Sequence, residues 1–162
     1  MNVFDYALKM ELDGKAFYEK LAQETESEGL QKIFSELAED EQKHYDIFAQ
    51  LKKNQNIDSM PDSVALEGAK NIFSQMQEDL SAQKLLKTNL DAYQHAMQAE
   101  KESAKLYRDA AAKEDSPEVK ALLLKIAIEE DKHFNILENI FDFVNAPTQS
   151  LVWGEFSNLN EY

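Results

Sequence analysis

Two Glu-x-x-His motifs stand in the sequence, Glu41 with His44 and Glu130 with His133. Residues three apart in an α-helix point the same way, so each motif would present a carboxylate and an imidazole side by side. A single such motif is weak evidence for a metal site, because acidic helices also produce it by chance. For one motif alone, a buried hydrogen-bonded Glu–His pair is the better explanation. Here both motifs interrupt an apolar stripe at the same place, which predicts that all four side chains point into one core.

Two further glutamates, Glu11 and Glu100, fall at inward positions of their own amphipathic segments. Four carboxylates in one apolar core would be costly if they were left unpaired, and two divalent cations would balance their charge. A Glu from each of two helices plus Glu-x-x-His from two others is the ligand set of di-iron and di-manganese bundles. Such ligands suit iron or manganese, and zinc would also be accepted. The predicted metal ligands are Glu11, Glu41, His44, Glu100, Glu130 and His133.

Two tyrosines, Tyr18 and Tyr107, follow Glu11 and Glu100 by seven residues, two helical turns along the same face. They could hydrogen-bond a metal ligand or act as a one-electron relay, and plain aromatic packing explains them equally well. His95 is offset from this face and is interpreted as a surface residue. A solvated face is predicted for the acidic neighbours Glu39, Asp40, Glu129 and Asp131.

The elements that must position these side chains are four long segments with apolar residues at helical spacing. Ser27 and Ser116 are suited to cap the second and fourth segments, and Pro117 suits a first helical position. The sequence therefore predicts an all-α, ferritin-like four-helix bundle. Residues 54–88 are predicted to form a long crossover containing a short helix. The bundle domain would span 1–146, and 147–162 would be a C-terminal tail packing on it.

The chain also repeats itself without a gap when it is shifted by 89 residues. The shift places Glu11 on Glu100, Tyr18 on Tyr107, Ser27 on Ser116, Glu41 on Glu130 and His44 on His133. Two helical hairpins related by a pseudo-twofold axis would produce this pattern and would bring each matched pair to the same depth.

Composition narrows the functional class. The chain has 162 residues, no cysteine and a formal net charge of −14. The absence of cysteine excludes disulfides and thiolate metal sites, and the negative charge disfavours nucleic acids and anionic membrane surfaces. No apolar run approaches the roughly 20 residues of a membrane span, and the N-terminus lacks a basic-then-apolar leader. We therefore expect a cytoplasmic protein.

At the candidate ligands the sequence resembles the rubrerythrin family of the ferritin-like superfamily. The stretches that carry the resemblance are ALKMELDGKAFYEKLA, LAEDEQKHYDIF, AMQAEKESAKLYRDAA and IAIEEDKHFNIL, together with the tail WGEFSNLNEY. The resemblance implies that Glu41 and Glu130 bridge two metals, that Glu11 and Glu100 are terminal ligands, and that His44 and His133 bind one metal each.

The resemblance implies a di-iron oxidoreductase, a homodimer, that reduces hydrogen peroxide or dioxygen with electrons from a separate protein such as a rubredoxin. The chain departs from rubrerythrins proper by lacking the four-Cys rubredoxin module, and by carrying Ser103 where they hold a further carboxylate. Because a hydroxyl is a poor iron ligand, we expect slower peroxide turnover than in relatives with that carboxylate. The alternatives are a ferritin- or bacterioferritin-like ferroxidase that stores iron, and a metal-dependent binding or sensor module without turnover.

Overall fold

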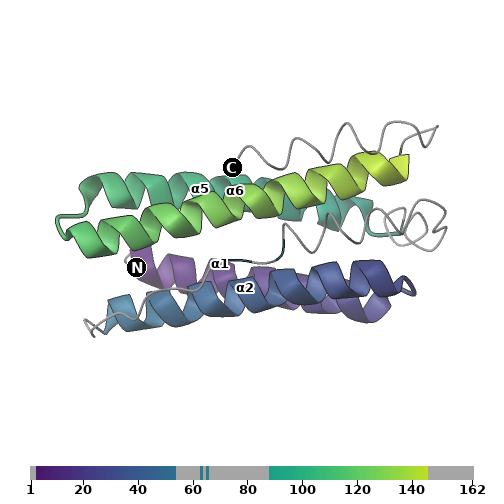
Figure 1. Cartoon of the computed structure of the whole chain (residues 1–162), viewed down its shortest axis with the longest axis horizontal. Coiled ribbons are helices and arrows are strands. Elements are labelled where there is room, and N and C mark those ends of the chain that lie inside the picture. Colours follow the sequence, from purple (N-terminus) through teal and green to yellow (C-terminus); the bar gives the residue numbers. More distant parts are fainter. Residues whose placement is uncertain (1–2, 54–62, 64, 66–87, 146–162) are drawn as a thin grey trace.

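The computed structural model describes residues 3–53, 63, 65 and 88–145 (Figure 1). In this part of the chain all regular structure is α-helical, which confirms the predicted fold class. The long helices are α1 (Val3–Glu24), α2 (Glu28–Lys52), α5 (Leu90–Lys113) and α6 (Pro117–Asn145).

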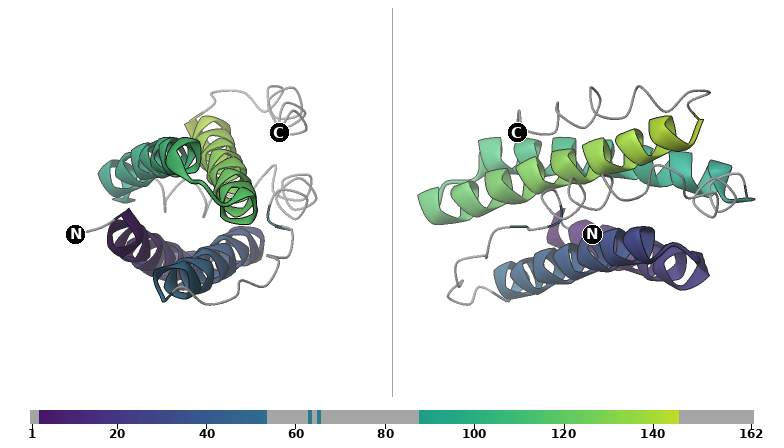
Figure 2. Two further views of the ribbon diagram at one scale, coloured as in Figure 1. Left: turned by 90° about the vertical axis from the view of Figure 1, so that its left-hand side faces the viewer. Right: turned by 45° about the vertical axis from the view of Figure 1, so that its right-hand side comes forward.

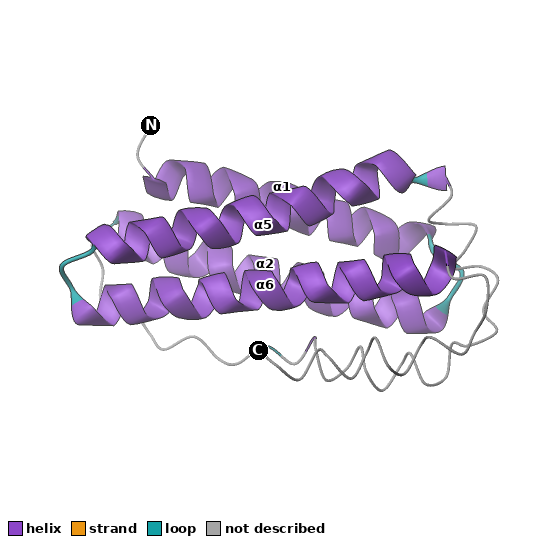
Figure 3. Ribbon diagram, turned by 90° about the horizontal axis from the view of Figure 1, so that it is seen from above, coloured by secondary structure: helices purple, strands orange, loops and turns teal. Residues whose placement is uncertain are grey.

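The helices form two hairpins, α1 with α2 and α5 with α6, as the internal repeat predicts. Seen end-on, the four helices occupy the corners of a bundle, with α5 beside α1 and α6 beside α2 (Figure 2). The view from above shows the same neighbours lying along one another (Figure 3). Each bundle side therefore pairs two helices that are repeats of each other, and the two sides face a common core.

Both predicted serine caps form. The Ser27 hydroxyl accepts a hydrogen bond from the Leu30 amide at 3.2 Å, and the Ser116 hydroxyl accepts one from the Val119 amide at 3.4 Å. Pro117 is the first residue of α6. Its fixed φ suits that position, where no amide proton is required. These caps hold the hairpin turns at one end of α2 and of α6, and so set the register of both Glu-x-x-His motifs.

The apolar core consists of two clusters that share no residue. The first packs Tyr18 and Leu21 of α1 against Phe34 of α2 and Leu137 of α6. The second packs Ala7, Phe48, Tyr107 and Ile126 and their neighbours. On every helix the predicted metal ligands lie between the residues of the first apolar cluster and those of the second. The carboxylates and imidazoles therefore form a layer across the middle of the bundle.

The expected crossover over 54–88 and the tail over 147–162 lie almost entirely outside the described residues. Within the crossover, Ser63 donates a hydrogen bond to Asp40, and Ala65 is buried in the first apolar cluster. The short helix in the crossover, the packing of the tail and the domain boundary at 146 stay predictions. None of the helices in the described part is long and apolar enough to cross a membrane.

Candidate metal centre

The structure brings all six predicted ligands together in the middle of the bundle, each buried to at least 94%. Their side-chain atoms form two groups, within each of which the candidate ligand atoms lie within 4.8 Å of one another. One group contains Glu11, Glu41, His44 and Glu130, and the other contains Glu41, Glu100, Glu130 and His133. Glu41 and Glu130 belong to both groups. The two groups therefore share the carboxylates of α2 and α6, whereas α1 and α5 contribute one carboxylate each to a single group.

Each imidazole is held on its outer side by a carboxylate from the opposite helix. Nε2 of His44 lies 3.0 Å from Oε1 of Glu129, and Nε2 of His133 lies 3.0 Å from Oδ2 of Asp40. An ionised carboxylate can only accept, so both Nε2 atoms donate, and both Nδ1 atoms face the cluster. A carboxylate–histidine pair of this kind fixes the ring and makes the inner nitrogen a stronger metal ligand.

Asp40 and Glu129 correct the sequence prediction. Both were expected on a solvated face, but they are only 2% and 3% exposed. The 89-residue repeat superimposes them, and each directly precedes the glutamate of its Glu-x-x-His motif. That signal was present in the sequence. Glu39 is exposed as predicted, and the half-buried Asp131 pairs with Arg108 at the surface.

The two tyrosines cross from one hairpin to the other. The Tyr107 hydroxyl of α5 donates to Oε1 of Glu11 at 2.6 Å, and the Tyr18 hydroxyl of α1 donates to Oε1 of Glu100. Their rings also pack in the two apolar clusters, so aromatic packing and hydrogen bonding to a candidate ligand occur together. Burial, then the charge of a neighbouring glutamate, raises the pKa of both tyrosines well above the usual range, which keeps the hydroxyls protonated as donors.

The four carboxylates separate into two electrostatic classes. Burial, followed by the charges of Glu11 and Glu100, raises the pKa of Glu41 and of Glu130 well above the usual range. Burial acts in the same direction on Glu11, but the charge of His44 and several hydrogen bonds outweigh it and lower the pKa to about 2. Without a metal, the shifts therefore favour the neutral form of the α2 and α6 carboxylates and the ionised form of Glu11.

Glu100 and the imidazoles complete this pattern. Burial raises the pKa of Glu100, but a hydrogen bond with Glu130 and the charge of His133 lower it below its usual value. Burial lowers the pKa of both histidines, but the charges of Glu11 on His44 and of Glu100 on His133, with hydrogen bonds, raise it well above the usual range. In a metal-free protein these shifts favour protons on Glu41, Glu130 and both imidazoles.

Several buried oxygen and nitrogen atoms of the cluster are free to bind metal ions. Hydrogen-bond partners are missing for Oε2 of Glu11, Oε2 of Glu100, Oε1 of Glu130 and Nδ1 of His44, although all four atoms are buried. Nδ1 of His44 lies 2.8 Å from Oε1 of Glu130, but the pair lacks hydrogen-bond geometry. Buried polar atoms are rarely left unpaired, and four unpartnered oxygen and nitrogen atoms that converge in one place are what a cation requires. Nδ1 of His133, by contrast, is paired with Oε1 of Glu41 at 2.9 Å. The donor set of oxygen and imidazole fits iron, manganese or zinc.

His95 is exposed, as predicted, and lies outside the cluster. Ser103 is buried, and its hydroxyl donates to the carbonyl of Ala99 at 2.9 Å, not to any of the six candidate ligands.

Comparison with known proteins adds one finding. The Rubrerythrin family model matches residues 2–141, which includes all six candidate ligands and both hairpins. No curated protein and no solved structure matches the chain significantly.

Proposed function

The chain belongs to the rubrerythrin family, and from this premise we propose that it is a non-haem di-iron oxidoreductase that reduces hydrogen peroxide or dioxygen with electrons from a separate protein, such as a rubredoxin. The observation that carries the proposal is the pair of buried carboxylate–histidine groups that share Glu41 and Glu130. We further expect a cytoplasmic homodimer.

In this proposal each residue of the cluster has one task. Glu41 and Glu130 would hold both metals, because they are the carboxylates common to both groups. Glu11 and His44 would be the further ligands of one metal, and Glu100 and His133 those of the other.

The remaining polar residues orient those ligands. Asp40 and Glu129 hold the imidazoles so that both Nδ1 atoms face the cluster. Tyr107 and Tyr18 each occupy one oxygen of a terminal glutamate and leave its unpartnered Oε2 available. Orientation by such partners keeps the ligands in place when the charge at the centre changes.

Two adjacent redox-active metals, when bound, supply the two electrons that cleavage of an O–O bond requires. Reduction of hydrogen peroxide consumes two electrons and two protons and releases two water molecules. The sequence has no cysteine to hold a thiolate-ligated iron site, which supports our proposal that a separate protein donates the electrons. The two apolar clusters border the carboxylate–histidine groups on either side along the bundle.

The test is a single-turnover measurement on protein loaded with ferrous iron without oxygen. We expect about two irons per chain and oxidation of both by one equivalent of hydrogen peroxide, faster than by dioxygen. Reduced rubredoxin should then restore the ferrous state. Glu39→Gln, a change of an exposed glutamate beside the motif, is the matched control and should behave as the wild type.

A storage function is distinguished in the same preparation. A ferroxidase would oxidise iron with dioxygen, accumulate many irons per chain and elute from a size-exclusion column as a large shell. A protein that does this and is not re-reduced by rubredoxin contradicts the peroxidase proposal. A protein that binds iron without reacting with either oxidant would be a binding or sensor module.

A further inference from the structure

A cavity of about 680 Å³ lies on one side of the bundle and reaches the carboxylate cluster. It is formed by α1 and α5, the neighbouring helices of that side in Figures 2 and 3. Its walls include Met10 and Phe17 of α1 and Ala96 and Ala99 of α5. The exposed residues Tyr6 and His95 also line it, so the cavity joins the surface to the core.

Three of the candidate ligands, Glu41, Glu100 and Glu130, line the inner end of this cavity. All three are at least 94% buried from bulk solvent. Oε2 of Glu100 and Oε1 of Glu130 have no hydrogen-bond partner. Unpartnered oxygens at the end of a cavity mark the place where a bound molecule would meet the metal centre.

The cavity is open because two repeat-related positions carry small residues. Gly14 follows Glu11 by three residues and Ser103 follows Glu100 by three, so both stand one turn from a terminal carboxylate. A Cβ added to Gly14 would lie 3.2 Å from Oε2 of Glu41, which is closer than ordinary van der Waals contact. The Ser103 hydroxyl turns back to the carbonyl of Ala99 and contacts the Met10 sulfur at 3.9 Å. Neither residue offers a side chain long enough to fill the space.

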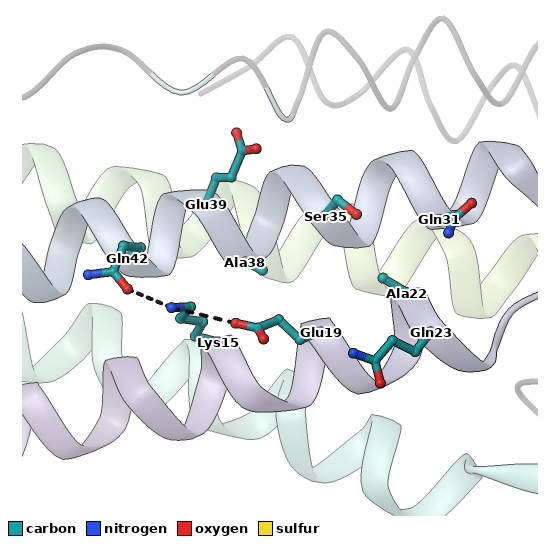
Figure 4. A pocket seen from close by; sticks show the side chains of 9 residues that line it. All are labelled: Lys15, Glu19, Ala22, Gln23, Gln31, Ser35, Ala38, Glu39 and Gln42. Carbon is teal, nitrogen blue, oxygen red and sulfur yellow. Dashed lines mark hydrogen bonds and ion pairs between the residues drawn. The ribbon is translucent and has the colours of Figure 1, made fainter.

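The groove between α1 and α2 differs from this cavity. It is lined by residues such as Ser35, Glu39 and Gln42, and by none of the six candidate ligands. Figure 4 shows that the Lys15 ammonium on α1 donates to Gln42 of α2 at 2.7 Å and pairs with Glu19 of its own helix at 3.6 Å. Lys15 thereby bridges the two helices across the groove, which offers no comparable route to the cluster.

Charge around the α1–α5 cavity restricts what can enter. The exposed acids Asp13 and Glu102 line it, and none of the described residues in its lining is a lysine or an arginine. With a protein net charge of −14, this environment repels anions and leaves uncharged molecules unaffected.

We propose that the α1–α5 cavity is the route by which a small uncharged oxidant reaches the metal centre, and that Gly14 and Ser103 are the residues that set its width. The inference rests on the proposed function for the identity of the oxidant, but the route itself does not depend on which reaction occurs. A larger side chain at Ser103 should slow access and leave the metal affinity unchanged, because Ser103 contacts none of the six candidate ligands by hydrogen bond.

The test uses Ser103→Leu and, as a matched control, Ser35→Leu in the α1–α2 groove. The probe is nitric oxide, a small uncharged ligand of ferrous iron, and its binding rate is followed by absorbance in stopped flow. We expect the Ser103→Leu protein to bind nitric oxide at least about tenfold more slowly than the wild type, because access to the iron then requires α1 and α5 to move apart. Iron content and circular dichroism should match the wild type, and Ser35→Leu should bind nitric oxide at the wild-type rate.

Ala96→Leu, on the same wall but not one of the candidate ligands, provides a second variant if Ser103→Leu does not fold. Binding of nitric oxide at the wild-type rate by a folded, iron-loaded Ser103→Leu or Ala96→Leu protein would overturn the proposal. Slower nitric oxide binding in a protein that shows no peroxide reduction would support the route and count against the proposed reaction alone.

Charge selectivity gives an independent readout. Replacing the acids of the lining, as Asp13→Lys with Glu102→Lys, should accelerate binding of azide several-fold at low salt and leave nitric oxide binding unchanged. An unchanged azide rate would mean that anions reach the centre by another path, and would contradict the assignment.

Discussion

The carboxylates of the α2–α6 side and those of the α1–α5 side differ in their surroundings. On the α2–α6 side, Glu41 and Glu130 belong to both ligand groups, and the imidazoles beside them are locked by Asp40 and Glu129. On the α1–α5 side, each glutamate belongs to one group and accepts a hydrogen bond from a tyrosine hydroxyl. The first side pairs each imidazole with a carboxylate of the opposite helix, whereas the second carries the cavity.

The pKa values of the glutamates also differ between the α2–α6 side and the α1–α5 side. Burial and like charges raise the pKa of Glu41 and Glu130, whereas histidine charge and hydrogen bonds bring the pKa of Glu11 and Glu100 below the usual value. The same residue type at nearly the same depth thus has its pKa shifted in opposite directions. The α2–α6 side therefore supplies the carboxylates common to both ligand groups, and the α1–α5 side completes each group and carries the cavity.

The largest expected effect comes from removing a shared carboxylate. Glu130→Gln should reduce bound iron from about two per chain to nearly none, because both ligand groups lose a member, whereas Glu11→Gln should retain about one. The measurement is elemental analysis after loading and desalting. Because burial and like charges raise the pKa of metal-free Glu130 and so favour its neutral form, the neutral glutamine replacement should leave the apo fold intact by circular dichroism. Equal iron loss in both variants would remove the distinction between the two sides.

The second prediction concerns removal of metal. Each metal at 100 to 1,000 times its Kd stabilises the fold by about 3–4 kcal/mol, so apo protein should melt at a lower temperature. The folded-state pKa values of His44, His133, Glu41 and Glu130 are raised above their unfolded values. Their stabilisation is therefore present near pH 5 and is lost as the pH rises toward 8.

Glu11 and Glu100 do not alter this dependence of stability on pH between 5 and 8. Groups with a lowered folded-state pKa lose their stabilisation only when the pH falls below their unfolded pKa, which is 4.5 for glutamate. The loss of melting temperature on metal removal should hence be larger at pH 8 than at pH 5. Calorimetry of holo and apo protein at both pH values is the check. An apo protein equally stable at pH 5 and 8 would contradict burial of the cluster.

A smaller effect is expected from the carboxylates that hold the imidazoles. Asp40→Asn and Glu129→Gln should each weaken metal binding about 10- to 100-fold, because a neutral amide no longer increases the basicity of the inner ring nitrogen. Competition with a chelator measures the affinity. Glu39→Gln, an exposed acid next to Asp40, is the control. Wild-type affinity in both variants would show that these contacts are incidental.

An effect of similar size, but without loss of iron, is expected on the α1–α5 side. Tyr107→Phe and Tyr18→Phe each remove a hydrogen bond to a charged glutamate and should lower the free energy of unfolding by about 1.5–3 kcal/mol. Urea denaturation of iron-loaded protein measures the change, and iron content should stay the same. A tyrosine that acts as a relay would in addition slow oxidation of the centre in its phenylalanine variant. Loss of iron in either variant would mean that the tyrosine is needed for assembly.

Much of the site could be predicted because it depends on local periodicity. The Glu-x-x-His spacing places Glu41 and His44 on one face within a single helix, whatever the neighbours are. The gap-free repeat then required a second set of the same side chains, and the caps at Ser27 and Ser116 placed both sets at the same depth. All six candidate ligands, the four helices and their pairing follow from such short-range rules.

The contacts between helices were decided by the tertiary structure. Asp40 and Glu129 lie one residue outside the predicted inward face, and the rotation of α2 against α6 turns them toward the opposite imidazole instead of toward water. The crossing of Tyr18 to Glu100 also depends on the register of α1 against α5. Helical periodicity orients a side chain about its own axis but leaves the position and rotation of the neighbouring helix undetermined. The sequence by itself therefore determined which residues meet in the core, and only the packing of four helices decided which pairs bond and which side stays open.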